Sequence, residues 1–94
     1  METLRLTIVT PQRQVLDAAV RWVDVPAASG ELRALPEHAP TLGALGTGTV
    51  RYEAADKPGE QTVGVRGGFF EVLADKVTLL ADAVGVDAGN GATA

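Results

Sequence analysis

Apolar and polar residues alternate along most of this chain. In residues 4–10, Leu4, Leu6 and Ile8 would share one face of an extended backbone. Such a period of two is typical of strands with one buried face. Comparable runs follow within residues 14–26, 41–45, 49–54, 61–65, 69–73 and 76–81. Because no stretch shows the 3.6-residue period of an amphipathic helix, about eight to ten short strands predict an all-β fold, an antiparallel sandwich or barrel.

Two breaks in the alternation predict places where a strand bends. The apolar positions between residues 14 and 26 change parity after Val20, which indicates a bulge or a strand break near residues 17–19 or near Trp22. The Gly67-Gly68 pair permits a kink or a close approach to another strand. We therefore expect the backbone to change direction at both places.

The two phenylalanines must lie on opposite faces of one strand, because they are adjacent in sequence. Phe70 is in phase with Val72, so we expect Phe70 in the core. Phe69 then lies on the outer face, where a partner could contact it.

The segment from Gly30 to Leu42 interrupts the strand-like pattern. It holds two of the five prolines and the only histidine. Pro36 and Pro40 each fix their own φ and favour extended geometry in the residue before them. The pattern predicts a stiff loop that loses little freedom when it binds a partner.

Composition narrows the classes of protein to consider. The 94 residues suffice for one domain, and 46% of them are apolar. We expect this domain to span residues 1–84, followed by a small-residue tail at 85–94 that should be flexible. A net charge of −4 argues against nucleic acid as a partner. With no uncharged run near eighteen residues, and no signal-peptide layout at the N-terminus, the sequence predicts a cytosolic chain that does not insert into a membrane.

The inventory of reactive side chains predicts a protein that is not an enzyme and binds no cofactor. The chain has no cysteine, so thiol catalysis and thiolate metal sites are excluded. His38 is the only imidazole and has no neighbouring ligand set, which makes a metal site improbable in this sequence. The only serine, Ser29, lies outside any nucleophile elbow, and the glycines form no phosphate-binding loop.

Three blocks of sequence resemble the epsilon subunit of rotary F-type ATP synthases. Residues 30–42 are similar to that family's GE(L/F)G-(I/V)-LPGHAPLL segment. Residues 4–11 are similar to its opening L-x-V-V-(T/S)-P, and residues 67–82 to its GGFLEV…NKVTVLAD. The blocks occur in the same order and at similar separations. The chain departs from the pattern at Arg33, Glu37 and Arg66, and its 94 residues include no segment that resembles the two-helix C-terminal domain typical of the bacterial subunit.

This resemblance implies a β-sandwich in the central stalk of an ATP synthase. One face would hold the gamma subunit, and the end that includes Gly30–Arg33 would rest on the polar loops of the c-ring, so that ion translocation is coupled to ATP synthesis. The chain would be a non-catalytic peripheral protein on the cytoplasmic face of the bacterial inner membrane. A stand-alone β-sandwich that binds a ligand or a peptide is the alternative.

Eight residues are candidates for contacts with these partners. They are Trp22, Glu31, Leu32, Arg33, His38, Pro40, Leu42 and Phe69. Three of them allow a second interpretation, and the first of these, Glu31, could simply be a solvated carboxylate in a turn. His38 could simply hydrogen-bond to the local backbone, and Trp22, as the only tryptophan, could lie in the core rather than at an interface.

Overall fold

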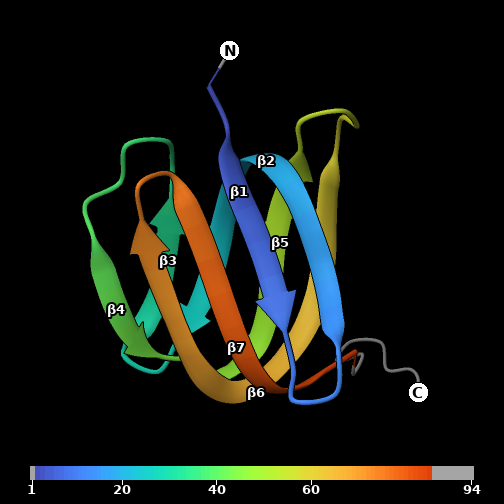
Figure 1. The fold of residues 1–94 in the computed structure, drawn as a ribbon, viewed down its shortest axis with the longest axis vertical. Coiled ribbons are helices and arrows are strands. Elements are labelled where there is room, and N and C mark those ends of the chain that lie inside the picture. Colours follow the sequence, from blue (N-terminus) through green and yellow to red (C-terminus); the bar gives the residue numbers. More distant parts are fainter. Residues whose placement is uncertain (1, 86–94) are drawn as a thin grey trace.

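Seven strands make up the part of the chain that the computed structural model describes, residues 2–85 (Figure 1). They are β1 (Leu4–Val9), β2 (Gln14–Ala27), β3 (Gly30–Ala34), β4 (Thr41–Ala44), β5 (Thr47–Ala54), β6 (Glu60–Leu73) and β7 (Lys76–Val84). The sequence suggested eight to ten strands. The number is smaller because β2 and β6, with 14 residues each, continue through bends that looked like strand breaks.

One continuous hydrogen-bonded sheet folds over into two layers, which confirms the β-sandwich. The first layer, at the front of Figure 1, contains β4, residues 65–73 of β6, β7, β1 and residues 14–20 of β2. The second contains β3, residues 20–27 of β2, β5 and residues 60–66 of β6. All these pairings are antiparallel except β1 with β7, which is parallel. The pattern within a strand does not encode its direction, so this exception was not foreseen.

The two long strands pass from one layer to the other where the sequence suggested that they bend. The pairing of β2 with β5 shifts register between Val20 and Trp22, as expected of a bulge. In β6, Gly67 and Gly68 have φ values of 64° and 116°. A Cβ on Gly68 would lie 2.0 Å from the carbonyl oxygen of Leu80, so only glycine fits there.

The core between the layers consists of the side chains that the alternation pointed inward. Leu4, Leu6, Ile8, Val20, Val23, Val25, Val50, Tyr52, Val65, Phe70, Val72, Val77 and Leu79 are among its buried members. Phe70 is 4% exposed whereas Phe69 is 64% exposed, which confirms the assignment of the two rings. The opposite orientation of neighbouring residues in a strand is the physical reason.

The segment predicted as a stiff loop is only partly a loop. Residues 30–34 form β3, which pairs with β2, and residues 41–44 form β4, which pairs with β6. The edge strand β3 does show the expected alternation, with Leu32 between the polar Glu31 and Arg33, and it pairs with β2. The neighbouring prolines made this short strand look like part of a loop. Residues 35–40 remain irregular and connect the two layers. The predicted tail at 85–94 lies outside the described residues, except for Gly85.

Candidate functional site: an apolar docking face

The outer surface of the first layer carries most of the exposed large apolar side chains. Within residues 2–85 there are five such side chains, and Leu42, Phe69, Leu73 and Leu80 lie on the strands of this layer. We call these four residues the apolar face. Phe69, Leu73 and Leu80 point outward because Phe70, Val72 and Leu79, their neighbours along the strands, fill the core. Leu42 lies opposite the exposed Glu71 and therefore shares their side of the layer.

Strand register aligns part of the apolar face in a row across the layer. Phe69 of β6 lies opposite Ala44 of β4 on one side and Leu80 of β7 on the other. Leu80 in turn lies beside Val9 of β1. Directly opposed side chains of neighbouring strands are about 4.5–5.5 Å apart at Cβ, so the row is a continuous apolar strip.

Two hollows flank this strip. One, of about 330 Å³, is lined by Val9, Pro11, Phe69 and Leu80 among others. The second, of about 260 Å³, lies between β4 and β6 and is lined by Pro40, Leu42, Glu71 and Leu73 among others. Both are shallow and open to solvent, so they suit the side chains of a docked protein better than an enclosed small molecule.

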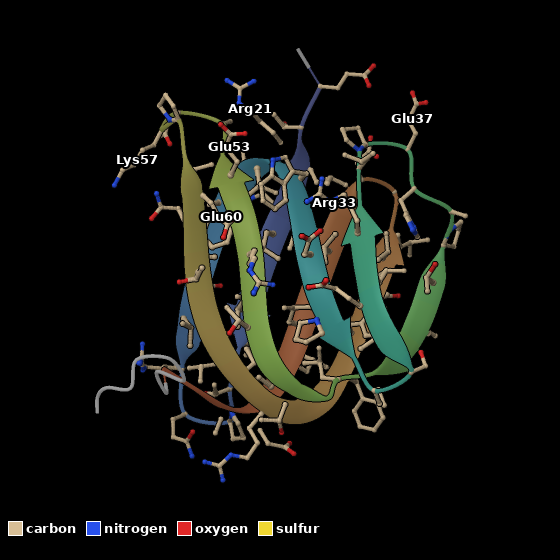
Figure 2. The ribbon with its side chains drawn as sticks, turned by 180° about the vertical axis from the view of Figure 1, so that it is seen from behind. Arg21, Arg33, Glu37, Glu53, Lys57 and Glu60 are labelled. Atoms are coloured by element: carbon tan, nitrogen blue, oxygen red, sulfur yellow. The ribbon has the colours of Figure 1, made fainter. Side chains whose placement is uncertain are left out.

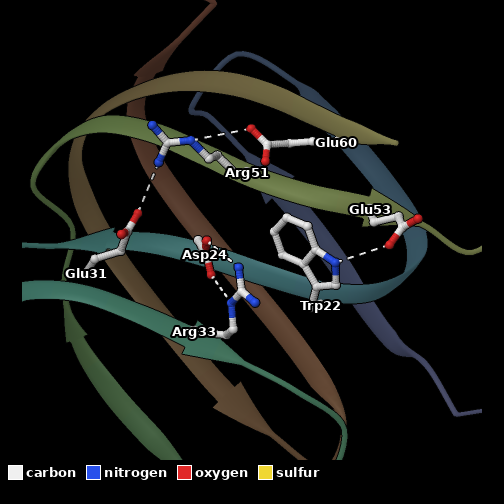
Figure 3. A network of polar contacts seen from close by, with 7 residues as sticks. All are labelled: Trp22, Asp24, Glu31, Arg33, Arg51, Glu53 and Glu60. Carbon is white, nitrogen blue, oxygen red and sulfur yellow. Dashed lines mark hydrogen bonds and ion pairs between the residues drawn. The ribbon is translucent and has the colours of Figure 1, made fainter. Parts of the chain in front are cut away.

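The outer surface of the second layer is more heavily charged than that of the first layer, where Arg5 of β1 and Asp17 of β2 form an ion pair beside the apolar strip. Figure 2 shows the second layer from outside, and Figure 3 shows the polar contacts that cover it. Arg33 of β3 binds Asp24 of β2 through two hydrogen bonds, of 2.7 Å from Nε and 3.0 Å from Nη2. The side chain of Asp24 is only 12% exposed. The hydrogen bond to Asp24 raises the pKa of Arg33 further, so the guanidinium remains charged.

Trp22 is tied into this charged surface. The guanidinium carbon of Arg33 lies 4.4 Å from the centroid of the Trp22 ring, within the range of a cation–π contact. The indole Nε1 donates to Glu53 Oε1 at 3.2 Å. Trp22 is half-buried, so it belongs neither to the core nor to a freely exposed surface.

Arg51 organises the other half of the same surface. Its Nη1 lies 3.2 Å from Glu31 Oε2, and its Nε lies 3.5 Å from Glu60 Oε2 (Figure 3). We call Trp22, Asp24, Glu31, Arg33, Arg51, Glu53 and Glu60 together the charged face. Each charged member of the charged face except Glu53 has an oppositely charged partner on it, and Glu53 accepts from the indole.

The eight candidate contacts therefore separate into groups. Trp22, Glu31 and Arg33 meet on the charged face, whereas Leu42 and Phe69 belong to the apolar face, with Pro40 at its edge. Leu32 is half-buried and packs against the core.

His38 lies apart from both groups. It is in the loop at 35–40, and its Nδ1 is 2.8 Å from the carbonyl oxygen of Ala39, which agrees with the interpretation as a local backbone contact. Figure 1 shows this loop at the end of the sandwich opposite the turn that precedes β3, where Glu31 lies. His38 and Glu31 therefore do not form one site.

The sequence analysis missed Leu73 and Leu80 as surface residues. The signal was present, because in Val77-Thr78-Leu79-Leu80-Ala81 only one of the two leucines can face inward. Val77, Leu79 and Ala81 are in phase and buried, so Leu80 had to be the outward one.

The described residues hold no group of three or more histidine, cysteine, aspartate or glutamate side chains arranged to bind a metal ion. Across the same residues we find no helix long and apolar enough to cross a membrane.

Comparisons with known proteins agree with this architecture. The chain is 47% identical over 81 residues to an ATP synthase epsilon chain of Solibacter usitatus, covering 86% of this chain and 59% of that one. It is 46% identical over 84 residues to the ATP synthase epsilon chain of Bacillus subtilis, covering 88% and 61%. The chain thus spans about three fifths of the length of these relatives.

Solved structures show the same fold. A chain in the Euglena gracilis mitochondrial ATP synthase (OSCP, F1 and c-ring) superposes with a TM-score of 0.79 at 20% identity, over 87% of this chain and 52% of that one. A chain of the Tetrahymena thermophila mitochondrial ATP synthase central stalk and c-ring superposes with a TM-score of 0.69 at 14% identity, over 88% and 66%. The model of the ATP synthase delta/epsilon chain beta-sandwich domain matches residues 3–85, and the chain therefore belongs to that family.

Proposed function

We propose that this chain is a central-stalk subunit of an F-type ATP synthase and docks the gamma subunit through its apolar face. The observation that carries the proposal is the gathering of Leu42, Phe69, Leu73 and Leu80 on one outer surface. Scattered exposed leucines are normal on a soluble domain, but an aligned apolar strip with flanking hollows is typical of a protein interface. The similarity to ATP synthase epsilon chains, and to a chain of a solved central-stalk and c-ring assembly, supports another subunit of the stalk as the occupant.

The energetics favour this face over the charged one. A docked partner would remove apolar area from water at about 25 cal/mol per Å², and it would have to leave Glu71 and Asp82, which line the two hollows, in contact with water or with a basic group. On the charged face, a partner would first have to replace ion pairs that already satisfy one another, and such exchanges contribute little net affinity.

A second contact, with the polar loops of the c-ring, belongs at the end of the sandwich where β3 begins. Glu31 is exposed there, and Arg51 pairs with both Glu31 and Glu60. These three side chains together carry a net charge of −1. A basic or amide group on a loop of the ring would complement it. The exposed pairs involved are individually weak, so we expect this contact to orient the subunit more than to hold it.

In this role the chain is mechanical and non-catalytic. It would rotate with gamma and the c-ring, coupling ion translocation to ATP synthesis, as a peripheral protein on the cytoplasmic face of the bacterial inner membrane. The long strands β2 and β6 each take part in both layers, so we expect the two faces to move together as one body.

The experiment is co-purification of the tagged full chain with the gamma subunit of the same organism's ATP synthase. We expect a one-to-one complex that survives gel filtration at moderate salt, because apolar contacts are little screened. A chain that fails to retain gamma and instead captures a small ligand or a peptide would contradict the proposal.

A further inference from the structure

The loop at 35–40 is held in an unusual conformation. The amide of His38 donates to the carbonyl oxygen of Leu35 at 3.0 Å, which closes a four-residue turn. Pro36 occupies the second position of this turn, and Glu37, in the third, has a φ of 71°. These are the features of a type II turn, whose third position favours glycine. Glu37 is therefore a residue in the left-handed region that something else must stabilise.

The stabilising group comes from a distant part of the chain. Asp75, in the turn between β6 and β7, accepts a hydrogen bond from the backbone N–H of Glu37 through Oδ1 at 2.6 Å. Asp75 itself has a φ of 61°, in the region that aspartate tolerates better than most residues. Its carbonyl oxygen also accepts from the amide of Arg5, at 2.9 Å. One residue thus joins the start of β1, the β6–β7 turn and the irregular loop.

This junction lies beside the apolar face. Pro40, at the end of the loop, and Leu42 line one wall of the hollow of about 260 Å³, and Leu73 lines the other. Leu73 is the last residue of β6, two positions before Asp75. Anchoring Glu37 to Asp75 therefore sets where the loop side of the hollow lies relative to the β6 side.

We propose that Asp75 is a positioning residue for partner docking, a latch that holds the loop at 35–40 against the β6–β7 turn so that Pro40, Leu42 and Leu73 present one surface. The inference rests on the proposed function, since the surface it orders is the edge of the apolar face. A carboxylate suits this task because a charge-assisted hydrogen bond to an N–H is roughly twice as strong as a neutral one. Asp75 itself need not contact the partner.

The test uses three variants of the full chain. Asp75→Gly removes the carboxylate while relieving the positive φ of residue 75, and Asp75→Asn keeps an acceptor oxygen and tolerates the same backbone conformation. Asp56→Gly removes an exposed aspartate from the turn between β5 and β6 and is the matched control. The measurements are hydrogen exchange of the Glu37 amide, the unfolding midpoint, and the dissociation constant for gamma.

We expect Asp75→Gly to speed exchange at Glu37 by about five- to tenfold and to weaken gamma binding by about two- to fivefold, with the unfolding midpoint retained. Asp75→Asn should restore about half of both losses, because a neutral acceptor forms a weaker hydrogen bond than a carboxylate does, and Asp56→Gly should change neither. Unchanged exchange at Glu37 in Asp75→Gly would overturn the latch. So would faster exchange with unchanged gamma affinity, because the loop would then be ordered for no docking purpose.

Should the unaltered chain bind no gamma at all, the proposed function fails while the exchange measurement still reports on the latch itself. Should Asp75→Gly lower the unfolding midpoint markedly, the exchange rate and the gamma affinity are compared between Asp75→Asn and the unaltered chain instead. A full loss in that variant, despite its retained acceptor, would overturn the assignment to hydrogen bonding.

Discussion

The two outer faces of this sandwich are made by the same kind of strand and yet differ in how their side chains are satisfied. On the charged face, Arg33 contacts both Asp24 and Trp22, and Arg51 pairs with two carboxylates. On the apolar face, Phe69 is 64% and Leu42 77% exposed, with water as their neighbour. The charged face has partners within the chain, whereas the apolar face would gain most from a partner outside it.

This difference shows that an exposed residue is a weak guide to function until its contacts are known. Arg33 and Trp22 are the residues that stand out in the sequence, and both are engaged internally. Leu80 looks ordinary in sequence, and its side chain is 52% exposed beside Phe69. A side chain that is exposed and also has no polar or ionic contacts within the chain is a better candidate for docking a partner.

The largest effect should come from breaking the bend that separates the two faces. Gly68→Ala would place a Cβ 2.0 Å from the carbonyl oxygen of Leu80, where β6 leaves one layer for the other. Because backbone must move to relieve this contact, we expect a loss of about 3 kcal/mol or more in the free energy of unfolding. Chemical denaturation followed by tryptophan fluorescence measures it.

Gly59→Ala is the matched control for that substitution. Gly59 also has a positive φ, of 104°, but no atom lies within 4 Å of the Cβ position. It should therefore cost only the conformational penalty, about 1–2 kcal/mol. Equal losses in the two variants would show that packing at the bend is unimportant.

A smaller effect should come from removing the cation that serves Asp24. In Arg33→Gly the carboxylate of Asp24, 12% exposed, would lose both hydrogen bonds from the guanidinium, and Trp22 would lose its cation. We expect a lower unfolding midpoint and increased solvent exposure of the indole, seen as a red-shifted emission. Arg51→Gly, which frees only the more exposed Glu31 and Glu60, should lower the midpoint less. A larger loss in Arg51→Gly would contradict this ranking of the two halves of the charged face.

The smallest effect concerns the core between the faces. Burial raises the pKa of Tyr52 above its usual value of 10.0, because the phenolate is disfavoured away from water. The unfolded chain would release this proton first as the pH rises. The stability contribution is therefore complete below about pH 10 and is lost as the pH rises through the folded-state pKa. Tyr52→Phe should flatten the decline of the unfolding midpoint as the pH rises above about 10. If the midpoint of Tyr52→Phe declines as steeply as that of the unaltered chain, the decline comes from titratable groups other than Tyr52.

Much of the fold could be predicted from alternation alone. The inward residues, the bulge near Trp22 and the bend at Gly67-Gly68 follow from parity and from glycine's freedom, both of which are local properties. The parallel pairing of β1 with β7 is a non-local property, and so is the continuity of β2 and β6 through both layers.

The candidate site was predictable only in part, for the same reason. The outward positions of Phe69 and Leu80 follow from phase, but their alignment with Ala44 and Val9 depends on strand register. The hydrogen bond from the Glu37 amide to the Asp75 carboxylate joins residues 38 positions apart, and no local sequence pattern predicts it. Resemblance to a family singled out residues 30–42, but it did not indicate that β3 and β4 of this segment belong to different layers.

The most direct test of the account compares gamma binding by two double variants, one on each face. Phe69→Ser with Leu80→Ser alters the apolar face, and Arg51→Ser with Glu60→Ser alters the charged face. The four residues are between 44% and 64% exposed, so each pair should change the free energy of unfolding by only about 1 kcal/mol. Isothermal titration with the gamma subunit gives the dissociation constants. The account predicts a loss of about 30-fold or more, equivalent to about 2 kcal/mol, for the apolar pair and less than about threefold for the charged pair. Unaltered binding by the apolar pair, with a loss confined to the charged pair, would contradict it.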